Sequence, residues 1–155
     1  GHNVRVIMTP NATRLIAAQL FESLTDQKVS VEMFDSGAGY SLEHISLAKW
    51  ADLLVIAPAS ANTIAKLSCG ICDNLLTSVA LALPVKTPKL IACAMNTQMW
   101  KNPATQKNIS AFSKLGNYII CGPAKGTLAS FDKGEGVLAP LEDIVDGIQS
   151  ALKKR

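Results

Sequence analysis

The sequence predicts an α/β fold in one domain: a doubly wound parallel sheet with helices on both faces. Strand-like apolar segments alternate with segments of helical periodicity, which is typical of this class. Residues 53–57 form a continuous apolar run, as expected for a strand buried on both faces. The 155 residues contain no internal repeat and no linker, so they predict a single core, over residues 1–155.

The first three elements are predicted as a strand, a helix and a strand, over residues 4–8, 11–24 and 29–34. The helix is predicted because apolar residues such as Leu20 and Leu24 recur at helical spacing. These three elements precede the central apolar run.

A loop and two helical stretches surround that run. Residues 35–41 contain two glycines and are predicted as a loop. Ser41 can cap a helix that carries His44. After the run, a helical stretch is predicted over residues 60–83, interrupted near Gly70.

The C-terminal elements alternate in the same way. A strand is predicted over residues 89–94, a helix over 103–115 and a strand over 117–121. Residues 122–140 are rich in glycine and too long for a plain connection, so we expect a functional flap there. A closing helix is predicted over residues 141–152.

Composition excludes several classes of protein. Hydrophobic residues make up 48% of the chain and charged residues 17%, which indicates a folded chain. The net charge of +3 comes from scattered basic residues, so no nucleic-acid partner is expected, and the basic run 153–155 is predicted to be a solvated helix end. No apolar stretch reaches about 18 residues, so we expect no membrane span, and no leader marks the chain for export.

The four cysteines have no disulfide-framework spacing, so we expect free thiols in a reducing cytoplasm. Cys69 and Cys72 have the spacing of a zinc knuckle or a redox pair. Zinc needs two more ligands, and Cys93 and Cys121 stand alone in predicted strands. We therefore predict no metal site.

The first candidate site is the string at residues 58–63, directly after the central strand. Ala61 leaves room for a planar ring, and Ser60 and Asn62 offer a hydroxyl and an amide to its polar edge. A helix that starts here also presents backbone N–H groups. An ordinary serine-capped helix is the alternative.

The second candidate is the string at residues 95–100. Asn96 can donate its amide to a carboxylate, and Met95, Met99 and Trp100 can exclude water from that bond. An asparagine-capped turn with packed apolar neighbours is the alternative.

Weaker candidates lie elsewhere. His44 can transfer protons near neutral pH, although a structural role is the alternative. Asp73 and Asn74 can contact a cofactor or cap a helix, and Thr9 can contact a phosphate.

Together these residues resemble the flavin-dependent cysteine decarboxylases, which include phosphopantothenoylcysteine decarboxylases and the peptidyl-cysteine decarboxylases of lantibiotic maturation. His44 and the strings at residues 58–63, 70–76 and 95–100 match in the family's order. The resemblance implies a Rossmann-like sandwich that forms homotrimers, often dodecamers, with FMN between subunits. It also implies oxidation of a cysteine thiol and loss of carbon dioxide to give an enethiol.

The resemblance implies roles for individual residues. His44 would be the catalytic base, and Asn96 would hold the substrate carboxylate within a clamp that includes Met95, Met99 and Trp100. The residues implied to contact FMN are Thr9, Ser60, Ala61, Asn62, Thr63, Asp73 and Asn74.

The chain departs from the family pattern in two places. The coenzyme A enzymes carry Leu-Ala-Cys-Gly-Asp in the flap, where this chain has Leu-Ala-Ser-Phe-Asp at 128–132. Ser130 thus replaces a proton-donating cysteine, and a hydroxyl is a weaker acid than a thiol. Cys121 is a conceivable substitute. We also expect that the family's first strand and its phosphate turn are missing.

Three functions follow from the resemblance. The first is FMN-dependent decarboxylation of (R)-4′-phospho-N-pantothenoylcysteine to 4′-phosphopantetheine in coenzyme A biosynthesis. The second is oxidative decarboxylation of a peptide's C-terminal cysteine to an enethiol, which Ser130 favours. The third is a catalytically silent regulatory flavoprotein.

Overall fold

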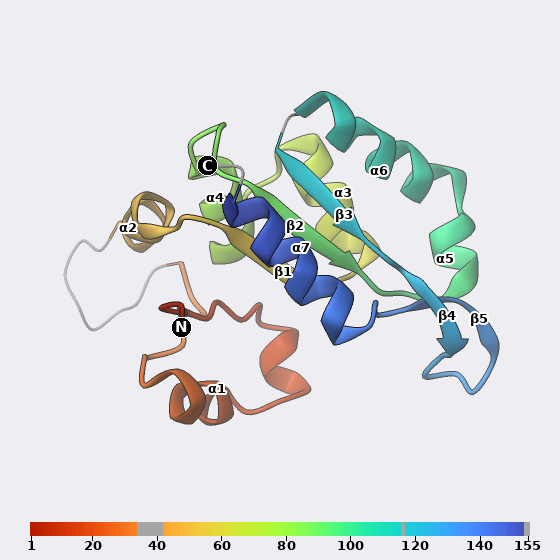
Figure 1. The fold of residues 1–155 in the computed structure, drawn as a ribbon, viewed down its shortest axis with the longest axis horizontal. Helices are drawn as coiled ribbons and strands as arrows, with labels where there is room; N and C mark the ends of the chain where they lie inside the picture. The colour runs from red at the N-terminus through yellow and green to blue at the C-terminus, as the bar shows by residue number, and fades with distance from the viewer. Residues whose placement is uncertain (34–41, 116, 154–155) are drawn as a thin grey trace.

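A parallel sheet lies between helices in this computed structural model, which describes residues 1–33, 42–115 and 117–153 (Figure 1). The sheet consists of β1 (Leu54–Ala59), β2 (Lys89–Cys93) and β3 (Tyr118–Cys121). The strands are parallel and lie in the order β1-β2-β3. The predicted α/β class is confirmed, and β2 in the centre is buried along its whole length.

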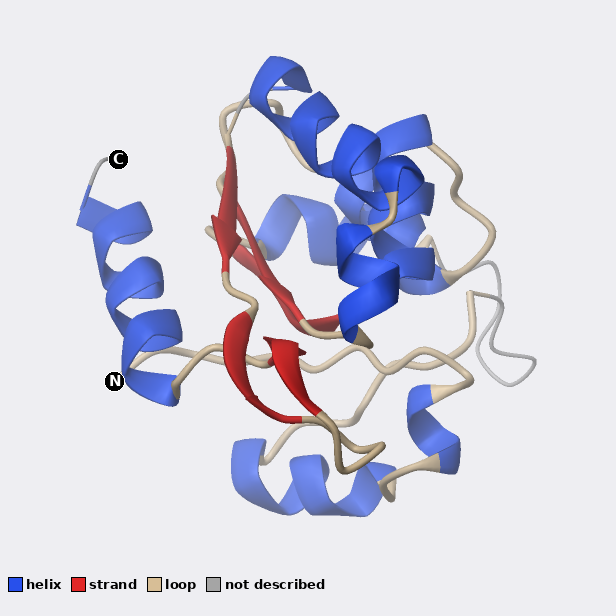
Figure 2. Ribbon diagram, turned by 90° about the vertical axis from the view of Figure 1, so that its right-hand side faces the viewer, coloured by secondary structure: helices blue, strands red, loops and turns tan. Residues whose placement is uncertain are grey.

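Helices cover both faces of the sheet, as Figure 2 shows. One face carries α3 (Ala61–Cys69), α4 (Leu75–Ala82) and α6 (Pro103–Leu115). The other carries α7 (Leu141–Lys153), which contacts β2 and β3. The predicted helices at 103–115 and 141–152 are therefore confirmed.

Each face has its own apolar core, because successive residues of β2 point to opposite faces. Ile91 packs in the larger cluster with Ile64 and Phe112, and Leu90 packs in the smaller one with Ile144. The two clusters fix the sheet between its helix layers.

The predicted interruption of the 60–83 helix is also confirmed. Gly70 ends α3 with a φ of 70°, a left-handed conformation in which glycine avoids the strain of a side chain. Helix α2 (Glu43–Trp50), which carries His44, packs against α4. The predicted loop at 35–41 and the Ser41 cap lie outside the described residues.

The N-terminal elements differ from the prediction. In the described parts of the strands predicted at 4–8 and 29–34, residues 4–8 and 29–33, the pairing is one parallel bridge between Ile7 and Ser30. The helix predicted at 11–24 is split into a 3₁₀ turn, η1 (Ala12–Arg14), and α1 (Ala18–Thr25). Both helical pieces lack a buried residue, so no packing holds them in one continuous helix.

The flap region at 122–140 contains an antiparallel hairpin of β4 (Ala124–Thr127) and β5 (Lys133–Val137). A short helix that the sequence did not predict, α5 (Thr97–Lys101), follows β2 and contacts β5. The hairpin and α5 lie at the carboxyl end of β2 (Figure 1).

Candidate functional site

The two predicted strings lie side by side at the carboxyl edge of the sheet. Ala59 at the end of β1 is in register with Cys93 at the end of β2, and the Ala94 N–H donates to the Ala59 carbonyl at 3.1 Å. The residues that follow, Ser60 and Met95, therefore start from neighbouring points. This edge is where parallel sheets place ligands.

Ser60 begins α3 as a helix cap. Its Oγ accepts from the Thr63 N–H at 3.4 Å and lies 3.3 Å from Thr63 Oγ1. The capping alternative is thus confirmed, and it is compatible with a ligand, because Ser60 and Asn62 are exposed. Ala57 and Pro58, late in β1, are exposed as well, so the strand end is open to a flat group.

Asn96 begins α5 in the same way. Its Oδ1 accepts from the Gln98 N–H at 2.8 Å, so the cap uses only the oxygen of the amide. The Nδ2 half, which is the donor, is left for a ligand such as a carboxylate. Met99 is exposed beside it, whereas Met95 and Trp100 pack partly against the larger core cluster.

Asn74 is a third cap, at the start of α4. Its Oδ1 accepts from the Thr77 N–H at 3.0 Å, and its Nδ2 donates to Asp73 at 3.0 Å. Lys66 donates to both oxygens of Asp73, at 2.9 and 2.6 Å. The hydrogen bond from Lys66 lowers the pKa of Asp73, so this carboxylate stays ionised.

His44 lies in the first turn of α2 and carries a buried, unpaired atom. Its Nδ1 has no hydrogen-bond partner within the described parts of the chain. An unpaired buried polar atom costs about 1–3 kcal/mol. Figure 1 shows α2 and α5 at opposite sides of the sheet, so one chain does not bring His44 to Asn96.

Thr9 is engaged locally. Its Oγ1 accepts from the Ala12 N–H at 3.2 Å and closes η1. Its predicted contact with a phosphate stays a prediction.

Ser130 lies at the tip of the β4–β5 hairpin. Its Oγ donates to Asp132 at 2.9 Å, and a hydroxyl that donates to a carboxylate holds its proton firmly. The neighbouring Phe131 is 90% exposed and has a φ of 65°. Ser130 is therefore open to solvent but is a poor acid.

Cys121, the alternative donor, ends β3 and is partly buried. Burial, with a smaller effect of the Asp143 carboxylate, raises the pKa of its thiol. The thiol thus keeps its proton at neutral pH.

The hairpin is fixed to the strand end through glycines. The Met95 N–H donates to the Gly136 carbonyl at 2.9 Å. A Cβ on Gly136 would lie 2.0 Å from the Met95 carbonyl oxygen, and one on Gly134 would lie 2.2 Å from Thr97 Oγ1. Sequence reasoning missed this docking, although glycines at alternate positions of a strand indicate a close approach.

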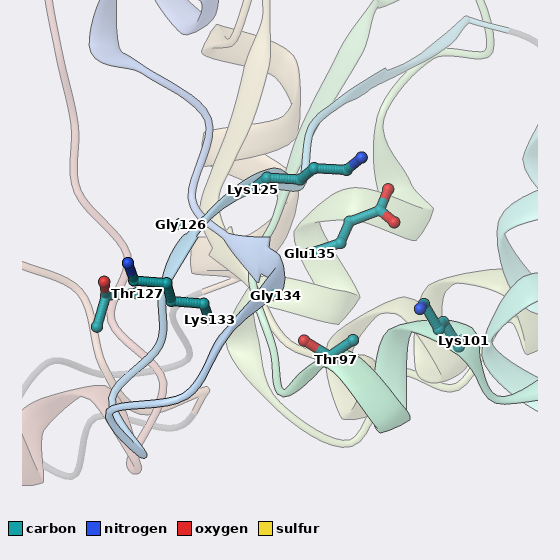
Figure 3. Close-up of a pocket in the computed structure, with 8 residues that line it drawn as sticks. All are labelled: Thr97, Lys101, Lys125, Gly126, Thr127, Lys133, Gly134 and Glu135. Atoms are coloured by element: carbon teal, nitrogen blue, oxygen red, sulfur yellow. The ribbon is translucent and has the colours of Figure 1, made fainter.

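A cavity of about 610 Å³ lies between α5 and the hairpin (Figure 3). Its lining comes from both elements and consists of Thr97, Lys101, Lys125, Gly126, Thr127, Lys133, Gly134 and Glu135. Thr97 lies in the candidate string at residues 95–100 and the hairpin residues lie in the predicted flap, but the sequence analysis did not name Lys101 or any hairpin lysine as a site residue. The alternation of lysine and glycine in 125–127 and 133–136 is the signal that could have found them.

The described residues contain neither a metal-binding cluster nor a membrane-spanning helix. In residues 1–33, 42–115 and 117–153, no three His, Cys, Asp or Glu side chains group as a metal site, and no helix is long and apolar enough to cross a membrane. Cys69 and Cys72 are exposed free thiols.

Comparison with protein families gives one match that spans the chain. The family described as Flavoprotein matches residues 1–153. A probable phosphopantothenoylcysteine decarboxylase of Streptococcus mutans is 43% identical over 152 residues, which cover 98% of this chain and 84% of that protein. The coenzyme A biosynthesis bifunctional protein CoaBC of Vibrio cholerae is 41% identical over 143 residues, or 92% of this chain. The match covers 35% of that protein's length.

Solved structures give the same result. A cysteine-to-serine variant of PPC decarboxylase, complexed with pantothenoylaminoethenethiol, is 34% identical and superposes with a TM-score of 0.81, over 96% of this chain and 82% of that one. The FMN-dependent cysteine decarboxylase SpaF is also 34% identical, with a TM-score of 0.81, over 97% and 78% of the two chains.

Proposed function

The chain belongs to the flavoprotein family, and from that membership we propose that it is an FMN-dependent phosphopantothenoylcysteine decarboxylase. The reaction would convert (R)-4′-phospho-N-pantothenoylcysteine to 4′-phosphopantetheine in coenzyme A biosynthesis. The observation that carries the proposal is the 43% identity to a probable decarboxylase of this kind over 98% of the chain.

The carboxyl edge of β1 fits a flavin. Its exposed end is flat and lined by small residues, and the first turn of α3 presents backbone N–H groups to a polar ring edge. When bound, FMN supplies two-electron oxidation of the substrate thiol and its reversal. The residues proposed to hold it are Thr9, Ser60, Ala61, Asn62, Thr63, Asp73 and Asn74.

Three groups of the chain would act on the substrate. The Asn96 Nδ2 would donate to the substrate carboxylate and orient it. The exposed Met99, with Trp100 next to it, would exclude water from that contact. His44 would take up the proton that the substrate loses.

We propose that two copies of the chain complete each site. Within one chain, α2 and α5 lie apart, and the His44 Nδ1 is buried with no partner among the described residues. A neighbouring copy that brings its Asn96 to FMN beside His44 would join the two parts of the site. A homotrimer, alone or within a dodecamer, provides such contacts. The free thiols fit a reducing compartment such as the cytoplasm.

One observation favours a second candidate function, oxidative decarboxylation that stops at the enethiol. Ser130 stands where the coenzyme A enzymes carry a cysteine, and its hydroxyl donates a hydrogen bond to Asp132. A PPC decarboxylase in which serine replaces cysteine was solved with an aminoethenethiol compound. The natural substrate could then be a peptide that ends in cysteine.

Product mass separates the candidates. The purified chain, supplied with FMN, is incubated with phosphopantothenoylcysteine and with a peptide that ends in cysteine. Loss of carbon dioxide alone from the small substrate supports the first function. Loss of carbon dioxide and two hydrogens, above all from the peptide, supports the second. A chain that binds FMN and changes neither substrate is a silent flavoprotein.

The role of His44 is tested by substitution. His44→Asn should lower turnover by roughly 10²–10⁴-fold, the usual contribution of a positioned acid or base. The matched control is His2→Asn, because His2 is the chain's only other histidine and is exposed. Unchanged turnover in the His44 variant would remove that residue from the mechanism.

A further inference from the structure

The cavity between α5 and the hairpin carries an excess of positive charge. Lys101 and Lys125 extend their ammonium groups on the side of the hairpin where the Glu135 carboxylate lies, whereas the Lys133 side chain extends to the other side, beside Thr127 (Figure 3). Among the described residues, no salt bridge joins any of these lysines to an acidic group. Two ammonium groups and one carboxylate therefore leave this side of the hairpin with one positive charge in excess.

Helix α5 and the β4–β5 hairpin, which carry these lysines, have defined positions. Lys101 comes from α5 and faces the hairpin across the cavity, whereas Lys125 and Glu135 extend from paired positions of β4 and β5 (Figure 3). Lys133 lies beside its own partner in the register, Thr127. The hydrogen bond from Met95 to Gly136 holds the hairpin in place, so the charges have a defined position relative to the strand end.

The cavity begins next to the proposed carboxylate contact. Thr97, which lines it, directly follows Asn96 in the chain. The cavity extends along the hairpin from α5, so it offers room for the part of a substrate that lies beyond a carboxylate held at Asn96. The far end of that substrate is therefore the part that the lysines would meet.

We propose that this cavity binds the phosphate monoester of the substrate, and that Lys101 and Lys125 set the preference for a phosphorylated pantothenoyl substrate over a peptide. A phosphate monoester carries a charge of about −1.5 to −2 at neutral pH, so the excess positive charge on this side of the hairpin would attract it. Lysine binds phosphate as a point charge. This inference rests on the proposed function, because it identifies the part of that substrate which the hairpin recognises.

Binding of unreactive ligands tests the inference without any turnover. Calorimetry on the FMN-loaded full chain compares 4′-phosphopantothenate with pantothenate, which differ only in the phosphate. The wild-type chain should bind the phosphorylated ligand at least about tenfold more tightly. Lys101→Ala and Lys125→Ala should each weaken it by about two- to fivefold, the range of a single exposed charge pair, and leave pantothenate binding unchanged.

Three further variants distinguish the loss of a charge in the cavity from a general effect on the fold. Lys107→Ala removes an exposed lysine from α6, outside the cavity, and should change neither affinity. Lys125→Arg keeps the positive charge and should retain most of the preference, whereas Lys125→Glu should lower it further than Lys125→Ala. Equal affinity of the wild-type chain for both ligands, or equal weakening of both ligands in the lysine variants, would overturn the inference.

The outcome is separable from that of the proposed function. Decarboxylation without a preference for phosphate would overturn the cavity's role and leave the enzyme's activity in place. A preference for phosphate that the lysines control, in a chain that decarboxylates nothing, would support the cavity's role and overturn the activity.

Discussion

The strand ends and the β4–β5 hairpin both carry polar side chains, but they use them differently. At the strand ends, the side-chain oxygens of Ser60 and Asn96 accept hydrogen bonds from backbone N–H groups and begin helices. On the hairpin, Lys125 and Ser130 are exposed, and the backbone is held through glycines. At the strand ends, the side chains proposed to act on ligands also stabilise the fold. On the hairpin, the exposed side chains do not.

The two regions should therefore respond differently to substitution. A substitution at the strand ends should change both the free energy of unfolding and the turnover, because the same side chain caps a helix and is proposed to contact a ligand. A substitution of an exposed hairpin side chain should change the reaction or its specificity and leave the free energy of unfolding almost constant. The hairpin glycines are the exception, because they join the two regions.

The largest effect is expected where the regions are joined. Gly136→Ala should lower the free energy of unfolding by about 3 kcal/mol, because its Cβ would lie 2.0 Å from the Met95 carbonyl oxygen at a φ of 153°. It should also abolish most of the turnover by displacing the hairpin. Urea denaturation and an activity assay measure the two effects.

Gly70→Ala is the matched control for that variant. Gly70 also has a positive φ, of 70°, but nothing lies within 4 Å of a Cβ there. Its cost should be about 1 kcal/mol, the strain of the conformation alone. Equal costs at the two glycines would show that the hairpin is not fixed by contact with Met95.

Burial of Cys93 at the end of β2 should make the free energy of unfolding fall at alkaline pH. Burial, with a smaller effect of Cys121, raises the pKa of Cys93 from 9.0 to about 11. The unfolded chain therefore releases this proton first, and the stability that the folded thiol contributes is complete below pH 9 and is lost as the pH rises through 11. By pH 11 the loss should be about 2 kcal/mol.

The comparison is made against Cys93→Ala, since other groups titrate in the same range. Urea denaturation at pH 8 and pH 11 should show a loss for the wild-type chain that exceeds the loss for the variant by about 2 kcal/mol. An identical loss in both proteins would mean that the thiol is not buried as the structure has it.

Asn96→Ala should cost about 1 kcal/mol of stability, the value of a helix cap, and should also reduce turnover at least about tenfold. Asn102→Ala is the matched control, because Asn102 Oδ1 accepts from the Ala104 N–H at 2.9 Å at the start of α6. The control should lose similar stability and keep its turnover. If turnover falls equally in both variants, Asn96 acts only through the fold.

The smallest effect on stability is expected at the hairpin tip. Ser130→Cys should leave the free energy of unfolding within about 0.5 kcal/mol of wild type, as for most exposed substitutions. If the wild-type chain stops at the enethiol, as in the second candidate function, this variant should shift the product toward the reduced thiol, because a thiol is the stronger acid. Ser113→Cys, an exposed serine on α6, should shift nothing. An unaltered product ratio in the Ser130 variant would exclude the tip as proton donor.

Periodicity in the sequence predicted the centre of the fold well, because its strands and helices bury apolar residues on fixed faces. The run at 53–57 and the break at Gly70 are examples. It failed in the described residues 4–8 and 29–33, where apolar residues predicted strands but only the Ile7–Ser30 bridge forms. Pairing depends on tertiary neighbours, which a local pattern does not contain.

The candidate site was partly predictable for the same reason. The strings that contain Ser60 and Asn96 follow strands, so the sheet brings them together. The cavity at the hairpin was missed, because it forms only after Gly136 docks on Met95. The separation of His44 from Asn96 within one chain is also a property of the fold that no local pattern reveals.

The mass of the product formed from phosphopantothenoylcysteine by the FMN-loaded chain tests the central claim most directly. We expect a product that has lost carbon dioxide, with or without two hydrogens, and the same lysine-dependent preference for phosphate that the ligands show. Recovery of the substrate unchanged, from a chain that has bound FMN, would contradict the proposal that this flavoprotein is a decarboxylase.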